Sequence, residues 1–386
     1  MAPGEAPHVR VLVVTPHLQV FVRDQVAQLQ PRVHHMAALV VRPRPGFLDP
    51  LRSSRYGLDR GLDLPAETYR SLLLSTRWPL PLDRLAGAGS VLGRLLDRGS
   101  FDLVHAHFLY PPGAVAARAT RARRTPLVVT GHGFDVYRLP HRNARWGRRI
   151  REVLSASSAV ITVSEANARL LGELGAPVAK IHVIPNGFDP ALFHPGPSAA
   201  ARASLGLPVE APLLLAVGQL VPIKGYEVLL QAVGRLPSAT QLVILGRGKG
   251  MASLQRLAAR LGLAGRVHFR GEVPHAAVGE YMRAADLFVH SSRMEGNPAV
   301  LVEALGCGRP AVATRVGGIP DILSDRLGVL TEPDDPARLA GAVQEALGRR
   351  WDPERIASTA SRWAWPRLAD DILAVYRRVV SGDVGR

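Results

Sequence analysis

Short apolar runs alternate with longer stretches of helical pattern along this 386-residue chain, and this alternation constrains the fold most. It predicts parallel β-sheets with helices on both faces. The series pauses over residues 186–212, which are rich in proline and glycine, so the chain divides there into two halves. The expected strands are Val9–Thr15, Met36–Val41, Phe101–His107, Leu127–Gly131, Ala159–Val163, Ile181–Pro185, Leu213–Val217, Gln241–Leu245, Val267–Arg270, Leu287–His290, Ala311–Thr314 and Gly328–Leu330.

A chain of this length is expected to form two domains, each large enough to bury its own core. We predict an α/β fold of two Rossmann-like parallel-sheet domains that face each other across a cleft, with ligands at the carboxyl ends of the strands. The predicted N-terminal domain comprises residues 1–190, the linker 191–212 and the C-terminal domain 213–362. The amphipathic segment 363–386 is expected to be a C-terminal helix.

Hydrophobic residues make up 47% of the chain, which indicates a globular and not a disordered protein. No apolar run is as long as a membrane span, and the first residues lack the basic and apolar regions of a signal peptide. The single cysteine, Cys307, excludes an internal disulfide framework and suits a reducing compartment. We therefore expect a cytoplasmic location, with Cys307 as a small buried apolar residue.

The formal net charge of +16 predicts attraction to phosphates, whether in a nucleotide, an anionic lipid surface or a nucleic acid. No RNA-recognition signature, zinc finger or basic-zipper heptad is present, so nucleic acid is not an expected partner. Arginines cluster at 121–124 and 142–151, and the second cluster has a helical pattern that includes Trp146 and Ile150. We prefer a solvated helix face as its interpretation, with peripheral contact with an anionic membrane as the alternative.

The most informative motif is Glu295-Gly-Asn-Pro-Ala-Val-Leu-Val-Glu303. Asn297 is a favourable N-cap residue and Pro298 suits the first helical position, so a helix is predicted to start between the two carboxylates. Amides from Ala299 onward would then be unpaired at the positive end of the helix dipole, which suits a phosphate. A phosphate with hydroxyl-binding carboxylates on both sides describes a nucleotide sugar. An ordinary buried helix with two incidental acids is the alternative.

This motif, with Gly306-Cys-Gly-Arg-Pro310 and Gly317-Gly-Ile-Pro320 after it, resembles the signature of the retaining, family 4 glycosyltransferases of the GT-B fold. Within that family, the polar residue Gln219 and the run Phe21-Val-Arg-Asp-Gln-Val26 resemble the teichuronic-acid or exopolysaccharide branch. The resemblance implies that Glu303 binds the ribose hydroxyls and that Glu295 binds hydroxyls of the donor sugar.

Lys224, before Gly225, follows the predicted strand Leu213–Val217, where a cation can neutralise a leaving diphosphate. The family usually has Arg directly after the first glycine of this loop, but here Gly218 is followed by Gln219. Gln219 donates a hydrogen bond without neutralising charge, so one cation of the usual pair is missing. A surface lysine is the alternative interpretation of Lys224.

Two further glycine-containing loops follow strands. The loop Leu245-Gly-Arg-Gly-Lys-Gly250 lies near the nucleotide in the family pattern, so Gly246 and Arg247 are assigned to the donor; a glycine-rich turn with solvated basic residues is an equal alternative. The loop Thr130-Gly-His-Gly-Phe-Asp135 resembles the family motif whose His faces the donor sugar, and that role is carried to His132. Asp135 orients His132 or caps the next helix.

His105 and His107 alternate along a strand and face the same way, but no third metal ligand is evident. They are expected to be core residues or supports for the site. The loop after the first strand, from Thr15 to Phe21, lacks the family's glycines and is predicted to be shortened, which affects acceptor geometry. Asn186 and Gly187 form a turn expected at the border of the cleft.

The resemblance covers nearly the whole chain and implies a hexose-type transfer from a nucleotide-diphosphate sugar to an acceptor hydroxyl, with retained configuration and no metal. The implied acceptor is a saccharide or lipid-linked intermediate of envelope synthesis, bound by the first domain, on which the C-terminal helix packs. A catalytically decayed sugar- or partner-binding protein, a nucleotide-sugar epimerase and a basic nucleic-acid or membrane binder are the alternatives. The predicted catalytic residues are His132, Lys224 and Glu295, and the donor-binding residues are Gly218, Gln219, Lys224, Gly246, Arg247, Glu295, Gly296, Asn297, Pro298, Ala299, Val300 and Glu303.

Overall fold

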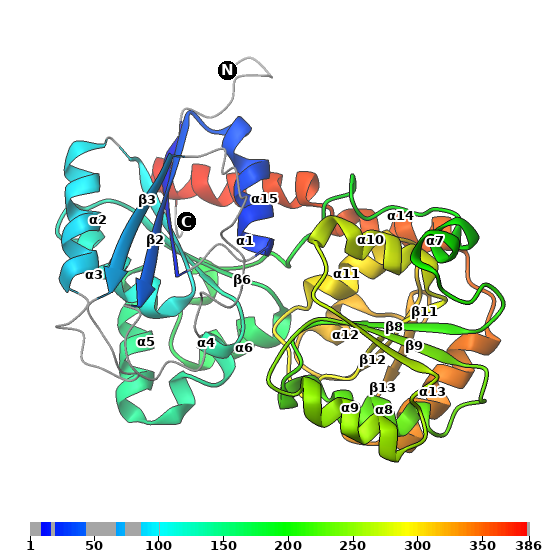
Figure 1. Ribbon diagram of the computed structural model, residues 1–386. Helices are drawn as coiled ribbons and strands as arrows, with labels where there is room; N and C mark the ends of the chain where they lie inside the picture. The colour runs from blue at the N-terminus through cyan, green and yellow to red at the C-terminus, as the bar shows by residue number, and fades with distance from the viewer. Residues whose placement is uncertain (1–8, 17–19, 44–66, 74–85, 100, 384–386) are drawn as a thin grey trace. The chain divides into compact units, whose positions relative to one another are not determined.

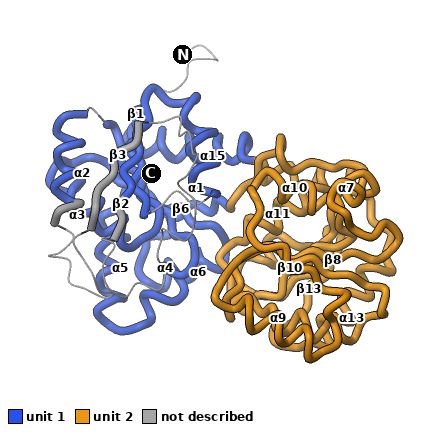
Figure 2. Tube along the Cα trace, in the orientation of Figure 1, with its two compact units in different colours: residues 1–185, 365–386 blue, residues 186–364 orange. Residues whose placement is uncertain are grey.

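The computed structural model describes residues 9–16, 20–43, 67–73, 86–99 and 101–383. The chain forms two compact units (Figure 2). Unit 1 comprises residues 1–185 together with 365–386, and unit 2 comprises residues 186–364. Among the described residues, no helix is long and apolar enough to cross a bilayer.

Unit 1 is built on a seven-stranded parallel sheet with the order β3-β2-β1-β4-β5-β6-β7 (Figure 1). The central strands of this sheet are largely buried, as expected for a sheet covered on both faces. The strands are β1 (Arg10–Thr15), β2 (His35–Pro43), β3 (Glu67–Leu73), β4 (Leu103–His107), β5 (Leu127–Gly131), β6 (Ala159–Thr162) and β7 (Ile181–Val183).

Helices pack on both faces of this sheet, because alternate strand residues point to opposite sides. Leu12 and Val14 belong to a core shared with α2, α3 and α5, whereas Val11 and Val13 belong to a core shared with α1 and α15. The C-terminal helix is thus part of unit 1. The helices are α1 (Val20–Leu29), α2 (Ala86–Arg98), α3 (Ala114–Arg121), α4 (Phe134–Tyr137), α5 (Ala144–Ala156), α6 (Glu165–Glu173) and α15 (Trp365–Ser381).

Unit 2 has a six-stranded parallel sheet with the order β10-β9-β8-β11-β12-β13. Its strands are β8 (Leu213–Val217), β9 (Gln241–Leu245), β10 (Val267–Gly271), β11 (Leu287–His290), β12 (Ala311–Thr314) and β13 (Gly328–Thr331). Its helices are α7 (Ser198–Leu205), α8 (Tyr226–Val233), α9 (Met251–Arg260), α10 (His275–Ala284), α11 (Ala299–Gly306), α12 (Ile319–Ile322), α13 (Pro336–Gly348) and α14 (Pro353–Ala360).

The strand order of unit 2 reverses at β8, which lies between β9 and β11. Open α/β sheets bind ligands outside the carboxyl ends of their strands at such a reversal. The segments that follow β8, β9 and β11 carry Lys224, Arg247 and Glu295, respectively. The fold therefore directs the predicted donor residues of this unit to one edge of one sheet.

The predicted α/β fold with parallel sheets is confirmed, and every strand expected from the apolar runs is present. Strand β3 was not predicted. The segment predicted as a linker, 191–212, differs from expectation: it contains helix α7 and belongs to unit 2, which begins at Asn186. The expected shortening of the first loop falls partly on residues 17–19, outside the described residues.

Candidate functional site

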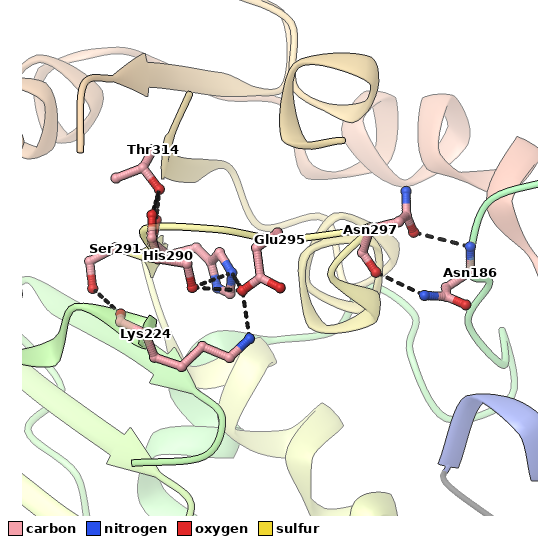
Figure 3. A network of polar contacts seen from close by, with 8 residues as sticks. Asn186, Lys224, His290, Ser291, Glu295, Asn297 and Thr314 are labelled. Carbon is pink, nitrogen blue, oxygen red and sulfur yellow. Dashed lines mark hydrogen bonds and ion pairs between the residues drawn. The ribbon is translucent and has the colours of Figure 1, made fainter. Parts of the chain in front are cut away.

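The candidate site of unit 2 is centred on Glu295, in the loop between β11 and α11. Its Oε1 atom lies 2.5 Å from Lys224 Nζ, 2.8 Å from His290 Nε2 and 2.6 Å from Ser292 Oγ (Figure 3). The Glu295 side chain is largely buried, whereas that of Lys224 is 24% exposed. Two residues that are 71 positions apart in the sequence thus form an ion pair at the carboxyl edge of the sheet.

Electrostatics keep Glu295 ionised. Burial on its own raises the pKa of its carboxyl, but the charge of Lys224 and the hydrogen bonds from His290 and Lys224 hold that pKa well below its usual value. Burial, assisted by the charge of Glu295, raises the pKa of the nearby Tyr226 hydroxyl. At neutral pH the site therefore contains an ionised carboxylate and a neutral phenol beside Lys224.

The position of Lys224 is fixed by contacts of the backbone around it as well as by the ion pair of its side chain. Gly225 has φ of +63°, and a Cβ there would lie 2.1 Å from the carbonyl oxygen of Ser291. Only glycine tolerates both this left-handed conformation and this close approach. The Ser291 hydroxyl also donates to the Lys224 carbonyl at 3.0 Å. The loops after β8 and β11 are thus fixed against each other beneath the ion pair.

Helix α11 begins at Ala299, with Pro298 at the capping position and no side-chain cap. The predicted capping role of Asn297 is wrong: its Oδ1 atom accepts from the Asn186 amide at 3.0 Å, and its carbonyl accepts from Asn186 Nδ2 at 2.8 Å (Figure 3). The amides of Ala299 and Val300 have no hydrogen-bond partner among the described residues. The start of α11, four positions after Glu295 in the sequence, therefore presents free donors, as an anion site requires.

The glycine turn after β12 supports the same loop. Gly317 has φ of +53°, and a Cβ there would lie 1.8 Å from the carbonyl oxygen of Glu295. The amide of Gly318 donates to the carbonyl of Gly296 at 3.0 Å. These contacts explain why the motif contains two glycines after the second glutamate, because a side chain at Gly317 would displace the Glu295 backbone.

Glu303 lies in the middle of α11 and is 4% exposed. Its Oε1 atom is 3.0 Å from Nε2 of His275, the first residue of α10. The His275 ring in turn packs against Phe193, with 5.0 Å between the ring centroids. The second glutamate of the motif is thus held by a histidine, and within the described part of the chain it forms no hydrogen bond or ion pair with Glu295 or Lys224.

The two glycine-containing loops after β8 and β9 lie together. The Leu220 amide donates to the Arg247 carbonyl at 2.9 Å, and the Gly218 amide donates to the Leu245 carbonyl, just before Gly246, at 3.0 Å. The Gln219 side chain is exposed. Arg247 forms an ion pair with Glu272 at 3.0 Å, which compensates part of its charge.

In unit 1, His132 directly follows β5, and its ring lies against that of another histidine. Its Nε2 atom lies 3.0 Å from Nδ1 of His107, and the two rings stack with 5.3 Å between centroids. Burial lowers the pKa of His107 to about 3 and holds that of His132 well below its usual value. Both rings are therefore neutral at pH 7, and one donates its single N–H to the other.

The neighbours of His132 are fixed by buried polar contacts. Both carboxylate oxygens of Asp135 accept backbone amides, from His132, Gly133 and Leu109 at 3.2, 3.0 and 2.8 Å. Asp135 thus orients the backbone of His132 and not its ring. His105 is fully buried, as expected for a core residue, and its ring nitrogens lie 2.6 Å from the Tyr376 hydroxyl and 2.7 Å from the Thr130 hydroxyl.

The basic helix α5 turns its apolar residues inward. Trp146 and Ile150 are buried, and the Arg149 guanidinium lies 5.2 Å from the Trp146 ring. These apolar side chains are therefore unavailable to a bilayer, and α5 does not present the apolar face of an interfacial helix. The exposed arginines of this cluster are Arg142, Arg145, Arg148 and Arg151.

Sequence analysis missed three polar side chains that hold the predicted glutamates: His290 and Ser292 for Glu295, and His275 for Glu303. A signal was present for the first two, because polar residues directly follow the apolar run 287–289 at a strand end. No signal identified His275. Among the residues that the structure describes, no group of three or more His, Cys, Asp or Glu side chains is placed to hold a metal ion.

Two parallel-sheet units of this kind define the GT-B class of glycosyltransferases, and solved structures of that class superpose on this chain. Anabaena HepE in complex with UDP and glucose has a TM-score of 0.78 at 22% identity, covering 96% of this chain and 100% of that chain. The sucrose-phosphate synthase of Thermosynechococcus elongatus has a TM-score of 0.75 at 22% identity, covering 97% and 100%. These likenesses confirm the predicted GT-B fold.

The chain belongs to the family 4-type GT-B glycosyltransferases. Residues 18–192 match the model of Glycosyltransferase Family 4, and residues 198–363 match that of Glycosyl transferases group 1. A D-inositol 3-phosphate glycosyltransferase of Acidothermus cellulolyticus is 34% identical over 81% of this chain and 77% of that protein. The one from Mycobacterium tuberculosis is 32% identical over 88% and 72%. The teichuronic-acid branch stays a prediction.

Proposed function

We propose that this glycosyltransferase moves a hexose-type sugar from a nucleotide-diphosphate sugar to an acceptor hydroxyl with retention of configuration. The observation that carries the proposal is the Lys224–Glu295 pair beside the free amides of Ala299 and Val300. A cation and unpaired amides suit a diphosphate, and an ionised carboxylate beside them suits sugar hydroxyls. This arrangement is what a nucleotide-sugar donor needs.

In the proposed reaction the bond between the anomeric carbon and the diphosphate oxygen breaks, and a bond to the acceptor oxygen forms. Lys224 and the amides at the start of α11 stabilise the negative charge on the leaving diphosphate. That phosphate takes the proton of the acceptor hydroxyl. Glu303 binds the ribose hydroxyls and Glu295 the sugar hydroxyls. The role proposed for His132 is contact with the donor sugar, and no metal ion takes part.

A uridine nucleotide is the first donor to test, because HepE has been solved with UDP and with UDP-glucose. For the acceptor we propose a saccharide or lipid-linked intermediate of envelope glycoconjugate synthesis, used at the inner face of an anionic membrane. The charge of +16 supports an anionic acceptor or surface. Because curated relatives are named for D-inositol 3-phosphate, this phosphorylated polyol belongs in the first acceptor screen.

A catalytically decayed sugar-binding protein is the second candidate, and the exposed Gln219 favours it. The loop after β8 provides Lys224 as its cation, while Gln219 contributes none. A site with less positive charge holds a diphosphate less firmly and stabilises its departure less.

The deciding experiment incubates the purified protein with a labelled nucleotide sugar and a panel of acceptors. Proton NMR of the product then gives the anomeric configuration. The proposal expects a glycoside with the configuration of the donor. A product of inverted configuration would contradict the retaining mechanism, and donor binding without any transfer or hydrolysis would favour the decayed protein.

A further inference from the structure

One oxygen of Glu295 is saturated, and the other is left free. Lys224, His290 and Ser292 all contact Oε1, at 2.5, 2.8 and 2.6 Å. The Oε2 atom receives no hydrogen bond from any side chain or amide that the structure describes. All dashed lines to this carboxylate in Figure 3 end on the same oxygen. A carboxylate held in this way presents a single oxygen to a ligand.

The three partners of Oε1 differ in rigidity. Lys224 is a flexible point charge on a partly exposed side chain, and it is satisfied equally well by either carboxylate oxygen or by a phosphate. His290 is 4% exposed, and its ring stacks on that of Phe288 with 6.0 Å between centroids. Ser292 is fully buried, and its carbonyl accepts from the Thr314 hydroxyl at 2.5 Å. His290 and Ser292 therefore fix the position of Oε1, while Lys224 is free to leave.

The hydrogen positions follow from the partners. An ionised carboxylate only accepts hydrogen bonds, so the contact of His290 with Glu295 requires a proton on Nε2. The Ser292 hydroxyl donates its proton to Oε1 and lies 3.1 Å from the same Nε2 atom. The Nε2–H group of His290 thus points between Glu295 Oε1 and Ser292 Oγ. If Nε2 accepted a hydrogen bond instead of donating one, His290 would lose its hydrogen bond to Glu295.

We propose that His290 is a positioning residue that keeps the Glu295 carboxylate in place when Lys224 turns to the diphosphate, so that Oε2 accepts a hydroxyl of the donor sugar. This inference rests on the proposed function. Because His290 and Ser292 hold Glu295, the two charged residues of the site can bind different parts of the donor. Lys224 serves the phosphate, and Glu295 serves the sugar. Without His290, the Glu295 carboxylate moves with the Lys224 side chain, or it rotates so that Oε2 no longer faces the donor sugar.

The test compares His290→Phe with His290→Gln. Phenylalanine keeps a planar ring but removes the donor, whereas the amide nitrogen of glutamine reaches about as far as Nε2 and restores it. His268→Phe is the matched control, because His268 also lies on a strand of this sheet and its ring bonds Gln241 at 3.0 Å. Calorimetry with each variant measures the Kd of UDP and of UDP-glucose, or of whichever nucleotide pair the wild type binds.

His290→Phe is expected to weaken nucleotide-sugar binding about tenfold relative to wild type, the scale of one hydrogen bond to a charged group, and diphosphate binding less than about twofold. His290→Gln is expected to restore most of the loss, and His268→Phe to leave both constants unchanged. In a transfer assay the same loss appears in kcat/KM for the donor.

Equal weakening of both ligands without recovery in His290→Gln would show a merely structural role and overturn the inference, as would wild-type constants in His290→Phe. In both cases the proposed function survives, because the wild type still binds and transfers. A wild type that bound neither ligand would overturn the proposed function and this inference with it.

Discussion

The polar side-chain clusters of the two units differ in charge: the cluster of unit 2 contains an ion pair, whereas that of unit 1 contains neutral histidines. In unit 2 a buried carboxylate and an ammonium group meet at 2.5 Å, and free helix amides lie beside them. In unit 1 three buried histidines stack, with 4.4 Å between the centroids of His105 and His107, and burial lowers the pKa of each. The first arrangement suits a ligand whose charge changes, and the second suits contact with a neutral one. The proposed roles of Lys224 and His132, for a diphosphate and for a sugar respectively, require this difference.

Removal of the Lys224 side chain of unit 2 is expected to have the greatest effect on activity. Lys224→Ala is expected to lower kcat for transfer about a hundredfold, because no other side chain contacting Glu295 neutralises the leaving diphosphate. Steady-state kinetics with the donor measure the loss, and the melting temperature shows whether the fold is retained. The control is Lys180→Ala in unit 1, which is expected to stay within about twofold of wild type. Turnover like that of the wild type in Lys224→Ala would contradict the site assignment.

A smaller loss is expected when the second glutamate of the motif is removed. Glu303→Ala should cost at least about tenfold in kcat/KM, chiefly through KM for the donor, because a carboxylate that accepts two hydroxyls supplies charged hydrogen bonds. The exposed Glu354→Ala is the matched control at the start of α14. If both variants keep the KM of the wild type, Glu303 is a structural partner of His275 and no ribose ligand.

Acid pH is expected to destabilise the protein through the buried histidines of unit 1. The folded histidines have depressed pKa values and stay neutral, whereas the unfolded chain binds protons below its ordinary histidine pKa of about 6.5. The neutral buried histidines therefore contribute their full stability above about pH 6.5. As the pH falls below that value, the free energy of unfolding decreases by about 1.4 kcal/mol per pH unit for each of these histidines.

Melting temperatures between pH 7.5 and 5 measure this effect in the wild type and in His107→Leu. The variant has one such histidine fewer, so its melting temperature is expected to fall less steeply with acid. The control is His34→Leu, which removes an exposed histidine. Equal slopes in wild type and His107→Leu would show that His107 is not held neutral by burial.

The smallest expected effect is a gain. Gln219→Arg adds a cation to the exposed loop after β8, and it is expected to tighten nucleoside-diphosphate binding about fivefold at low salt, as a partly exposed charge pair allows. Calorimetry at two salt concentrations measures the change, which should shrink as salt screens it. Gln219→Ala serves as the control for the lost glutamine. A gain that is independent of salt would mean that charge is not its cause.

Most of the fold was predictable, because strands buried on both faces read as continuous apolar runs. The exception is β3, whose sequence Glu67-Thr-Tyr-Arg-Ser-Leu-Leu73 is largely polar. It is an edge strand, paired only with β2, and edge strands carry polar residues that limit further pairing. A search of the sequence for continuous apolar runs therefore does not detect β3.

The site residues of unit 2 were predictable one by one, but their mutual contacts were not. Lys224 and Glu295 meet because β8 and β11 are neighbours, which follows from the strand order and not from local pattern. Asn297 has the residue type of a helix cap, yet Asn186, 111 positions earlier, supplies the amide that it binds. A long-range partner thus overrode a local preference. His290, by contrast, lies only five positions before Glu295, and the polar residues at the end of β11 were a local signal for its role that was passed over.

The central claim is that unit 2 holds a nucleotide-sugar site at the start of α11. Calorimetric titration of the wild type with a panel of nucleoside diphosphates and nucleotide sugars tests it most directly. One base and one sugar are expected to bind with distinctly higher affinity than the others, and Lys224→Ala is expected to weaken binding of both the nucleoside diphosphate and the nucleotide sugar. Absence of binding by every compound at millimolar concentration would contradict it.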